Sequence, residues 1–186
     1  MVCAHELGLA DRIELVPAKA SPVDRNTDLG EHGPLLQVPL LVSDEGDGIY
    51  DSRVICEHLD AVASGSLFGA GPSRVKRLTE AALGDGLLNA ALLNRYEATL
   101  RPAELRWDAW QTGQIGKVRD ALRRFERDAG ALGERVDIGT ITLGCALGYL
   151  DFRYGDLAWR DGHPGLARWY DVFSERPSMS ATAPQG

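Results

Sequence analysis

The chain has 186 residues and a formal net charge of −7, with a sequence pI near 5.1. This acidic balance gives no electrostatic footprint for nucleic acid or for an anionic membrane surface, because both are bound by basic patches. Hydrophobic residues make up 44% of the chain and charged residues 25%, which is ordinary for a globular protein of one large domain or two small ones.

The three cysteines give no sign of a metal site. Cys3, Cys56 and Cys145 lie far apart, and none takes part in a CxxC or Cys/His pattern with the spacing that zinc requires. Each sits among apolar neighbours, which favours small buried side chains in a reducing compartment. No apolar run approaches the ~20 residues of a membrane-spanning helix, and no secretory signal is visible. We therefore expect a cytoplasmic protein without a bound metal.

The amino-terminal third of the chain begins with short patterns of helix and strand. Residues 2–9 predict the end of a helix, with Gly8 near its carboxyl end. Residues 13–16 alternate between apolar and polar side chains, which predicts a short strand that Pro17 ends. Residues 21–34 are rich in Pro, Gly, Asn and Asp and predict a loop with at most one short helical turn.

A hairpin and a capped helix are predicted next. Residues 40–42 and 49–50 have the apolar character of two short strands, and the Asp- and Gly-rich segment between them predicts a tight turn. Ser52 then opens a helix whose apolar residues recur at helical spacing. The order of these elements predicts a small α/β domain over residues 1–62.

The rest of the chain is predicted to be helical. Residues 63–73 are rich in Gly, Ser and Pro and are interpreted as a linker. Residues 74–186 form the predicted helical domain, and their apolar residues recur with a helical period in four segments: 75–98, 113–131, 138–149 and 163–173. The third segment is apolar nearly all round, which is typical of a helix buried inside a bundle.

Five segments of the chain resemble the soluble glutathione transferase superfamily. They are HELGL (5–9), QVPLL (37–41), YDSRVICEHLD (50–60), LGCALGYLDFRY (143–154) and HPGLARWYDVFSERPS (163–178). No single segment is decisive, but their order and spacing agree with the bacterial members over nearly the whole chain. The resemblance implies a thioredoxin-like first domain, an all-helical second domain and a homodimer. It also implies glutathione as a co-substrate, with no further cofactor.

The resemblance implies a glutathione site at two places in the first domain. Pro39 would be a cis-proline, and the backbone of Val38 would pair with the cysteinyl backbone of glutathione while Gln37 reaches its glycine carboxylate. Ser52 would donate its hydroxyl and amide to the γ-glutamyl carboxylate, and Asp51 would accept from the ammonium group. Both places have a purely structural alternative. The proline can simply start a strand, and Asp and Ser are among the best N-caps.

Two further expectations concern the helical domain. Arg95, Tyr96 and Trp107 fall where the resembled enzymes face their electrophile, and ordinary helix packing is the alternative for all three. In the family, the position of Asp137 belongs to a capping box with Ser or Thr three residues earlier. Glu134 occupies that earlier place, so we expect an incomplete box and a weak helix start.

The catalytic residue stays unknown from the sequence. In the family, a Ser, Tyr or Cys at the end of the first strand or the start of the first helix activates the glutathione thiol. The chain begins inside that helix, so the first strand and this residue are expected to be missing. Either the true product begins upstream of Met1, or the chain is a truncated member without transferase chemistry.

The sequence therefore predicts a glutathione transferase (EC 2.5.1.18) that conjugates glutathione to a hydrophobic electrophile, impaired in catalysis if the amino terminus is truncated. The alternative is a non-catalytic relative that uses the same fold for dimerisation or for protein interaction. The sequence does not identify the electrophile.

Overall fold

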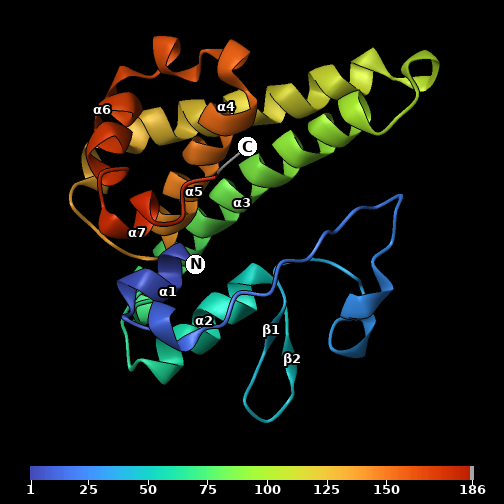
Figure 1. The fold of residues 1–186 in the computed structure, drawn as a ribbon. Coiled ribbons are helices and arrows are strands. Elements are labelled where there is room, and N and C mark those ends of the chain that lie inside the picture. The colour runs from blue at the N-terminus through green and yellow to red at the C-terminus, as the bar shows by residue number, and fades with distance from the viewer. Residues whose placement is uncertain (185–186) are drawn as a thin grey trace. The chain divides into compact units, whose positions relative to one another are not determined.

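The computed structural model describes residues 1–184, so the last two residues of the predicted helical domain, 185 and 186, lie outside the described residues. Its contacts divide the chain into two compact units. One comprises Met1 and Cys3–Ser66, and the other comprises Val2 and the described residues from Leu67 onward. The first is a small α/β unit and the second is entirely helical (Figure 1).

The first unit consists of short elements joined by long loops. They are α1 (Val2–Glu6), 3₁₀ turns at Ala10–Arg12 and Thr27–Glu31, β1 (Leu41–Val42), β2 (Gly48–Ile49) and α2 (Ser52–Val62). The end of α1 follows the prediction, because Gly8 has a positive φ of 68° and the Leu9 amide donates to the Ala4 carbonyl oxygen at 2.8 Å. Ala4, Leu9 and Leu59 form the buried core of this unit.

The hairpin is also as predicted. β1 and β2 pair antiparallel, with Leu41 opposite Ile49 and Val42 opposite Gly48. In the turn between them, the Gly46 amide donates to the Ser43 carbonyl oxygen at 2.9 Å, and Gly46 has a φ of 92° that suits glycine.

The predicted strand at residues 13–16 is wrong. This segment is not a strand, and no described strand pairs with it. Leu15 and Val16 are 66% and 77% exposed, so the alternation of apolar and polar side chains does not produce a buried face. A strand is defined by hydrogen bonds to a neighbouring strand, and side-chain alternation alone cannot supply that neighbour.

The helical unit is built around two long helices and one central helix. Its elements are α3 (Gly71–Thr99), α4 (Asp108–Leu132), α5 (Ile138–Arg153), α6 (Pro164–Phe173) and α7 (Pro177–Ser180), with 3₁₀ turns at Ala103–Leu105, Gly155–Leu157 and Trp159–Gly162. α3 packs along both α4 and α5, and α4 also packs on α6 (Figure 1). As its apolar pattern predicts, α5 supplies much of the core, and four of its apolar side chains are fully buried: Leu143, Ala146, Leu147 and Leu150.

The expectation of an incomplete capping box at α5 is wrong. Asp137 is itself the N-cap, and its Oδ1 accepts a hydrogen bond from the Thr140 amide at 3.1 Å. The Thr140 Oγ1 in turn accepts from the Asp137 amide at 3.0 Å, so the box is complete one helical turn later than the family pattern suggests. Gly139 is explained by close approach, because a Cβ there would lie 2.8 Å from Glu80 Oε2 on α3.

Gly144 marks a second close approach on α5. A Cβ at this position would lie 2.7 Å from Cε1 of Phe173, the last residue of α6. The Phe173 ring is 5% exposed and stacks on Trp169 with ring centroids 4.7 Å apart. Because the ring is enclosed on that side, only glycine allows α5 and α6 to pack this closely.

Cys3 is shielded by its neighbours in the first unit. Its side chain is 3% exposed, and its Sγ lies 3.9 Å from the Cys56 carbonyl oxygen. A side-chain hydrogen bond with Cys56, and then burial, raise the pKa of the Cys3 thiol above its usual range.

We expect Cys3 to react with iodoacetamide slower than Cys56 and Cys145 by at least on the order of tenfold, because the thiolate is the reactive form and the other two side chains are only half-buried. Peptide mass spectrometry after timed labelling of the native chain measures the three rates. In urea the three rates should converge. Equal rates in the native chain would contradict the burial and bonding of Cys3.

Candidate functional site

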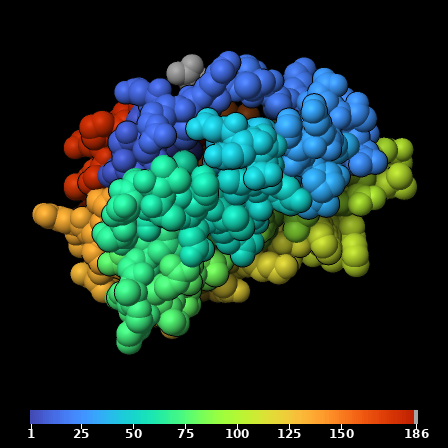
Figure 2. All heavy atoms as spheres, turned by 90° about the horizontal axis from the view of Figure 1, so that it is seen from below, coloured from blue at the N-terminus to red at the C-terminus, as the bar shows by residue number. Residues whose placement is uncertain are grey.

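The hairpin brings together the two segments that were predicted to bind glutathione. β1 and β2 pair Leu41 with Ile49, Pro39 lies two residues before β1, and Asp51 lies two residues after β2. The two predicted segments therefore lie at the same end of the hairpin, where α2 begins. In the space-filling view of Figure 2, the atoms of the hairpin and of α2, coloured cyan to teal, lie open on the surface shown.

The first segment presents an open backbone. The Val38–Pro39 peptide bond is cis, and Gln37 and Pro39 are exposed. Val38 is 50% exposed, and no hydrogen bond joins its amide or carbonyl group to another described residue. A backbone edge of this kind can accept an extended peptide in antiparallel pairing.

The second segment separates the roles of Asp51 and Ser52. Asp51 is the N-cap of α2, and its Oδ1 accepts a hydrogen bond from the Arg53 amide at 3.1 Å. Its Oδ2 lies 3.6 Å from an Arg53 guanidinium nitrogen, and 57% of the Asp51 side chain is exposed. Ser52 is the first helical residue and is exposed, and its hydroxyl has no hydrogen-bond partner among the described residues.

The structural alternative is therefore correct for Asp51 and does not account for Ser52. The capping bond joins one carboxylate oxygen of Asp51 to the Arg53 amide, while the hydroxyl and the amide of Ser52 have no acceptor among the described residues. The amino end of a helix carries partial positive charge from these amides, which suits a ligand carboxylate.

The three residues predicted to face the electrophile lie on α3 and just after it. Arg95 and Tyr96 are half-buried on α3, and Trp107, the residue before α4, is 64% exposed. Glu97 links these elements, because its Oε1 accepts from the Trp107 amide at 2.9 Å and its Oε2 accepts from Arg101 at 2.8 Å. The Arg101 side chain and the Trp107 amide lower the pKa of the Glu97 carboxyl.

A polar cluster between α3 and α5 was not predicted from the sequence. The Tyr154 hydroxyl donates to the Ala91 carbonyl oxygen at 2.6 Å and accepts from Asn94 Nδ2 at 3.0 Å. The Tyr149 ring lies 6.4 Å from the Tyr154 ring. Burial, and then the neighbouring Tyr154, raise the pKa of the Tyr149 phenol. The two hydrogen bonds of Tyr154 are long-range, and only the spacing of tyrosines in LGYLDFRY hinted at this cluster.

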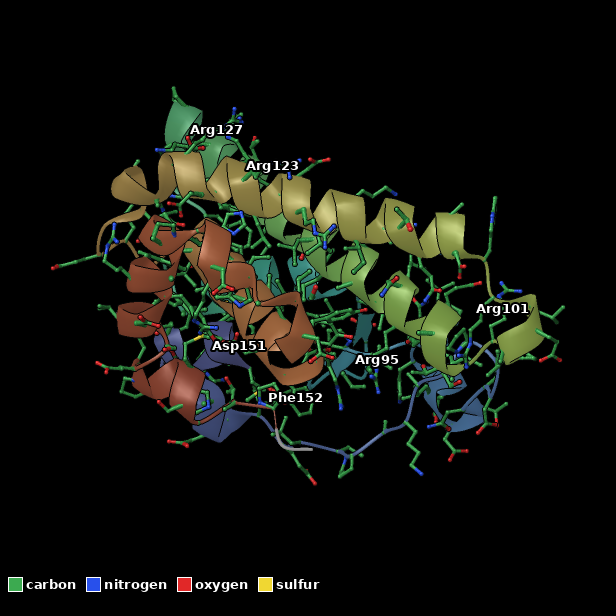
Figure 3. All side chains as sticks on the ribbon, turned by 90° about the horizontal axis from the view of Figure 1, so that it is seen from above. Arg95, Arg101, Arg123, Arg127, Asp151 and Phe152 are labelled. Atoms are coloured by element: carbon green, nitrogen blue, oxygen red, sulfur yellow. The ribbon has the colours of Figure 1, made fainter. Side chains whose placement is uncertain are left out.

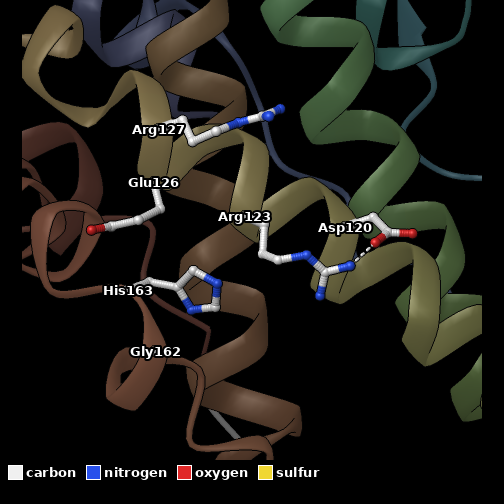
Figure 4. Close-up of a pocket in the computed structure, with 6 residues that line it drawn as sticks. All are labelled: Asp120, Arg123, Glu126, Arg127, Gly162 and His163. Carbon is white, nitrogen blue, oxygen red and sulfur yellow. Dashed lines mark hydrogen bonds and ion pairs between the residues drawn. The ribbon is translucent and has the colours of Figure 1, made fainter.

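A surface pocket elsewhere on the helical unit has a structural explanation. It is lined by Asp120, Arg123, Glu126, Arg127, Gly162 and His163 (Figure 4). Glu126 accepts hydrogen bonds from two first-turn amides of α6, those of Gly165 at 2.9 Å and Leu166 at 2.7 Å, and so caps that helix. Arg123 forms an ion pair with Asp120. None of the residues predicted to bind glutathione lines this pocket.

The described residues contain no group of three or more His, Cys, Asp or Glu side chains that could hold a metal ion. Among the same residues, no helix combines the length and the apolar character needed to span a membrane.

The fold and the open hairpin end define a two-domain protein, with a small thioredoxin-like domain followed by a helical domain. The model of the glutathione S-transferase N-terminal domain matches residues 1–62, and the model of the C-terminal domain matches residues 108–172. The chain belongs to the glutathione transferase family.

Three relatives illustrate this membership. A glutathione transferase family member from Pseudomonas fluorescens Pf-5, crystallised with bound glutathione, is 44% identical, with a TM-score of 0.96 over 100% of this chain and 92% of that one. A family member from the same strain, with bound S-(propanoic acid)-glutathione, is 43% identical with a TM-score of 0.90 over the same shares. The uncharacterized GST-like protein YibF of Escherichia coli K12 is 28% identical over 88% of this chain and 83% of its own length.

Proposed function

We propose that this chain is a cytoplasmic glutathione transferase that binds glutathione at the open end of its hairpin and conjugates it to a hydrophobic electrophile. One observation carries the proposal. The Val38 backbone and the Ser52 hydroxyl both lie at one end of β1 and β2, and neither forms a hydrogen bond with another described residue. The relatives crystallised with glutathione and with S-(propanoic acid)-glutathione support it.

Each part of glutathione has a matching group in this arrangement. Val38 pairs with the cysteinyl backbone, and the exposed Gln37 amide donates to the glycine carboxylate. Ser52 donates its hydroxyl and amide to the γ-glutamyl carboxylate, while the exposed oxygen of Asp51 accepts from the neighbouring ammonium group.

In the proposed reaction, the glutathione thiol gives its proton to solvent and the sulfur forms a bond to an electrophilic carbon of the acceptor, while the bond from that carbon to a leaving group breaks and the leaving group departs with its electron pair. Arg95, Tyr96 and Trp107 form the proposed face for that acceptor, because an apolar ring and a cation suit an electron-poor molecule. No described residue is assigned the role of activating the thiol. Cys3 does not suit it, because its side chain is buried and hydrogen-bonded to Cys56.

A non-catalytic dimerisation protein is the second candidate, and one observation favours it. Val75, Leu78 and Leu93 on α3 are 66%, 37% and 43% exposed, and their spacing places them on one face of the helix. An apolar stripe of this kind suits a second copy of the chain. We propose a homodimer for either function, and the sedimentation mass of the chain tests it.

Calorimetric titration of the purified chain with reduced glutathione tests the function. We expect Ser52→Ala to weaken binding by about tenfold or more, because a hydrogen bond to a charged group contributes about 1.5–3 kcal/mol. The thermal unfolding midpoint should stay unchanged, since the Ser52 hydroxyl has no partner in the protein.

The matched control is Ser180→Ala, which removes an exposed hydroxyl from the helical unit and should leave the affinity unchanged. A variant Ser52→Ala that binds as tightly as the wild-type chain would refute the assigned contact. A wild-type chain that is folded and dimeric but takes up no glutathione would favour the dimerisation protein instead.

A further inference from the structure

Two arginines of the helical unit carry charges that no carboxylate neutralises. Among the described residues, neither Arg95 on α3 nor Arg153 at the end of α5 has an acidic side chain within ion-pair distance. The acidic residues nearest to them in sequence are already engaged, since Glu97 binds Arg101 and Asp151 binds Arg160. A pair of unneutralised cations on one unit is an attractive site for an anion.

The packing of α3 on α5 fixes where these arginines lie. Asn94 donates to the Tyr154 hydroxyl at 3.0 Å and so locks the two helices together. Arg95 follows Asn94 in the chain and Arg153 precedes Tyr154, so each arginine is the neighbour of a bonded residue.

Figure 3 shows the same placement from above. It labels Arg95 on α3 and Phe152 at the end of α5. The Arg153 guanidinium lies 3.7 Å from the centroid of the Phe152 ring, and Arg95 has no such ring to cover it.

A buried hydroxyl between these helices lacks a partner. Tyr149 lies one helical turn before Arg153 on α5, and its phenolic oxygen is buried with no hydrogen bond to a described residue. The amide oxygen of Asn94, a residue only 8% exposed, is unpaired in the same way. An unpaired buried polar group costs about 1–3 kcal/mol, so a ligand or a water is expected to complete it. The phenol can donate to an anion, whereas the amide oxygen can only accept.

Both arginines influence the pKa of the Tyr149 phenol. Burial is the largest influence on the pKa of Tyr149 and raises it, with a further rise from Tyr154. Arg95 and Arg153 each act in the opposite direction, in line with their places next to Asn94 and Tyr154. The bond between Asn94 and Tyr154, together with the ring contact between Tyr149 and Tyr154, brings two cations and one donor to the same part of α3 and α5.

We infer that Arg95, Arg153 and Tyr149 form a subsite for a carboxylate on the electrophile, so that the acceptor substrate is an organic acid with an apolar body. The inference rests on the proposed function, because Arg95 belongs to the face proposed to receive the electrophile. A guanidinium binds a carboxylate through two parallel hydrogen bonds, and the Tyr149 hydroxyl supplies a third donor.

The helix dipole explains the position of Arg153 but not that of Arg95. The carboxyl end of a helix attracts cations, and Arg153 lies in the last turn of α5. Arg95 lies inside α3, a helix that continues to Thr99, and its side chain is half-buried. A half-buried cation without a carboxylate partner in the protein is available to an anionic ligand, and a substrate carboxylate is such a ligand.

A matched pair of glutathione conjugates tests the subsite. S-(carboxymethyl)glutathione and S-(carbamoylmethyl)glutathione have nearly the same size and differ by one negative charge. We expect the wild-type chain to bind the carboxylate conjugate about tenfold more tightly in a calorimetric titration, because charge-assisted hydrogen bonds are roughly twice as strong as neutral ones. A second pair, S-(2-carboxyethyl)glutathione and its amide, has one more methylene and places the carboxylate farther from the sulfur. The same comparison of affinities is made for this pair.

Four variants locate the effect. Arg95→Gln and Arg153→Gln should each bring the ratio of the two affinities below about threefold, and Tyr149→Phe should lower it less, since it removes one donor and no charge. Arg95→Lys keeps the charge and should restore part of the ratio. Arg127→Gln is the control, because Figure 3 shows Arg127 on α4 at the other end of the helical unit from Arg95.

The outcomes separate this inference from the proposed function. If the wild-type chain binds the acid and the amide equally at both lengths, the subsite is refuted and glutathione binding stands. If it binds neither glutathione nor any conjugate, the proposed function fails. A ratio that falls equally in Arg127→Gln would show a general charge effect and would also refute the subsite. Circular dichroism confirms that each variant is folded before it is titrated.

Discussion

Replacing Asp137 with alanine is expected to lower the free energy of unfolding of the helical unit by about 3 kcal/mol. The carboxylate is 1% exposed, caps α5 through the Thr140 amide, and lies 3.0 Å from Arg135 and 3.5 Å from Arg77. Its removal leaves a helix start uncapped and two partly buried guanidinium groups short of an acceptor. Breaking a buried ion pair typically costs about 3–5 kcal/mol. We expect the lower end of that range because Arg135 keeps its bond to Glu80 at 3.1 Å.

Urea unfolding followed by tryptophan fluorescence measures this effect on the right part of the molecule. All four tryptophans lie in the helical unit, at positions 107, 110, 159 and 169. Asp137→Asn is the matched control, because asparagine caps a helix nearly as well as aspartate but carries no charge. It should lose less than the alanine variant. A loss of unfolding free energy below about 1 kcal/mol for Asp137→Ala would contradict the stabilising role given to the contacts of Asp137 with Thr140, Arg135 and Arg77.

Replacing Glu126 with alanine is expected to cost about 2 kcal/mol at neutral pH, because two charge-assisted hydrogen bonds to the amides of Gly165 and Leu166 disappear. The carboxylate comes from α4 and holds the amino end of α6. No side chain of α6 itself caps that helix. The stability of α6 therefore depends on a residue about forty positions earlier in the chain.

The effect of Glu126 should depend on pH with a defined sign. Burial raises the pKa of this carboxyl, but the Leu166 and Gly165 amides and the charges of His163 and Arg168 together outweigh it, so the pKa is lowered. A group whose pKa is lower in the folded state stabilises the fold fully above the unfolded value. That contribution is lost as the pH falls through the folded value.

The difference in unfolding free energy between the wild-type chain and Glu126→Gln should therefore shrink between about pH 6 and pH 3. Urea titrations across this range measure it. Glu134→Gln, which replaces an exposed carboxylate with no hydrogen bond in the structure, is the control and should give a flat difference. A flat difference for Glu126→Gln as well would show that the amides of α6 do not depend on this charge.

Local features of this chain could be predicted from the sequence. Gly8 ends α1 and the Asp- and Gly-rich turn closes the hairpin, because both depend on backbone conformations that a few residues decide. The helices of the second unit follow from apolar residues at helical spacing, and α5 is buried as its all-apolar pattern indicates. The family resemblance assigned Val38 and Ser52 to a glutathione site, and that assignment stays a prediction.

Features that depend on distant partners could not be predicted. The segment 13–16 has the alternation of a strand, yet nothing in its own residues reveals whether a neighbouring strand is present. The capping box of α5 was expected between residues 134 and 137, and it lies one turn later, between Asp137 and Thr140. The sequence is compatible with Asp137 either as the N-cap or as the third residue of the helix, so it could not decide between the two. The unpaired phenol of Tyr149 depends on the register of α5 against α3, which no local pattern encodes.

The contact between Gly144 and the Phe173 ring has a consequence for how this chain can diverge and be recombined. Residues on the outer face of α4 can be exchanged one at a time, but any side chain at position 144 demands a smaller residue at position 173 in the same step. We therefore expect the two positions to change together. A chimera that takes α6 from this chain and α5 from a relative should express well only where the relative also supplies glycine at the position of residue 144. Libraries that randomise both positions together should return the pair far more often than either residue alone.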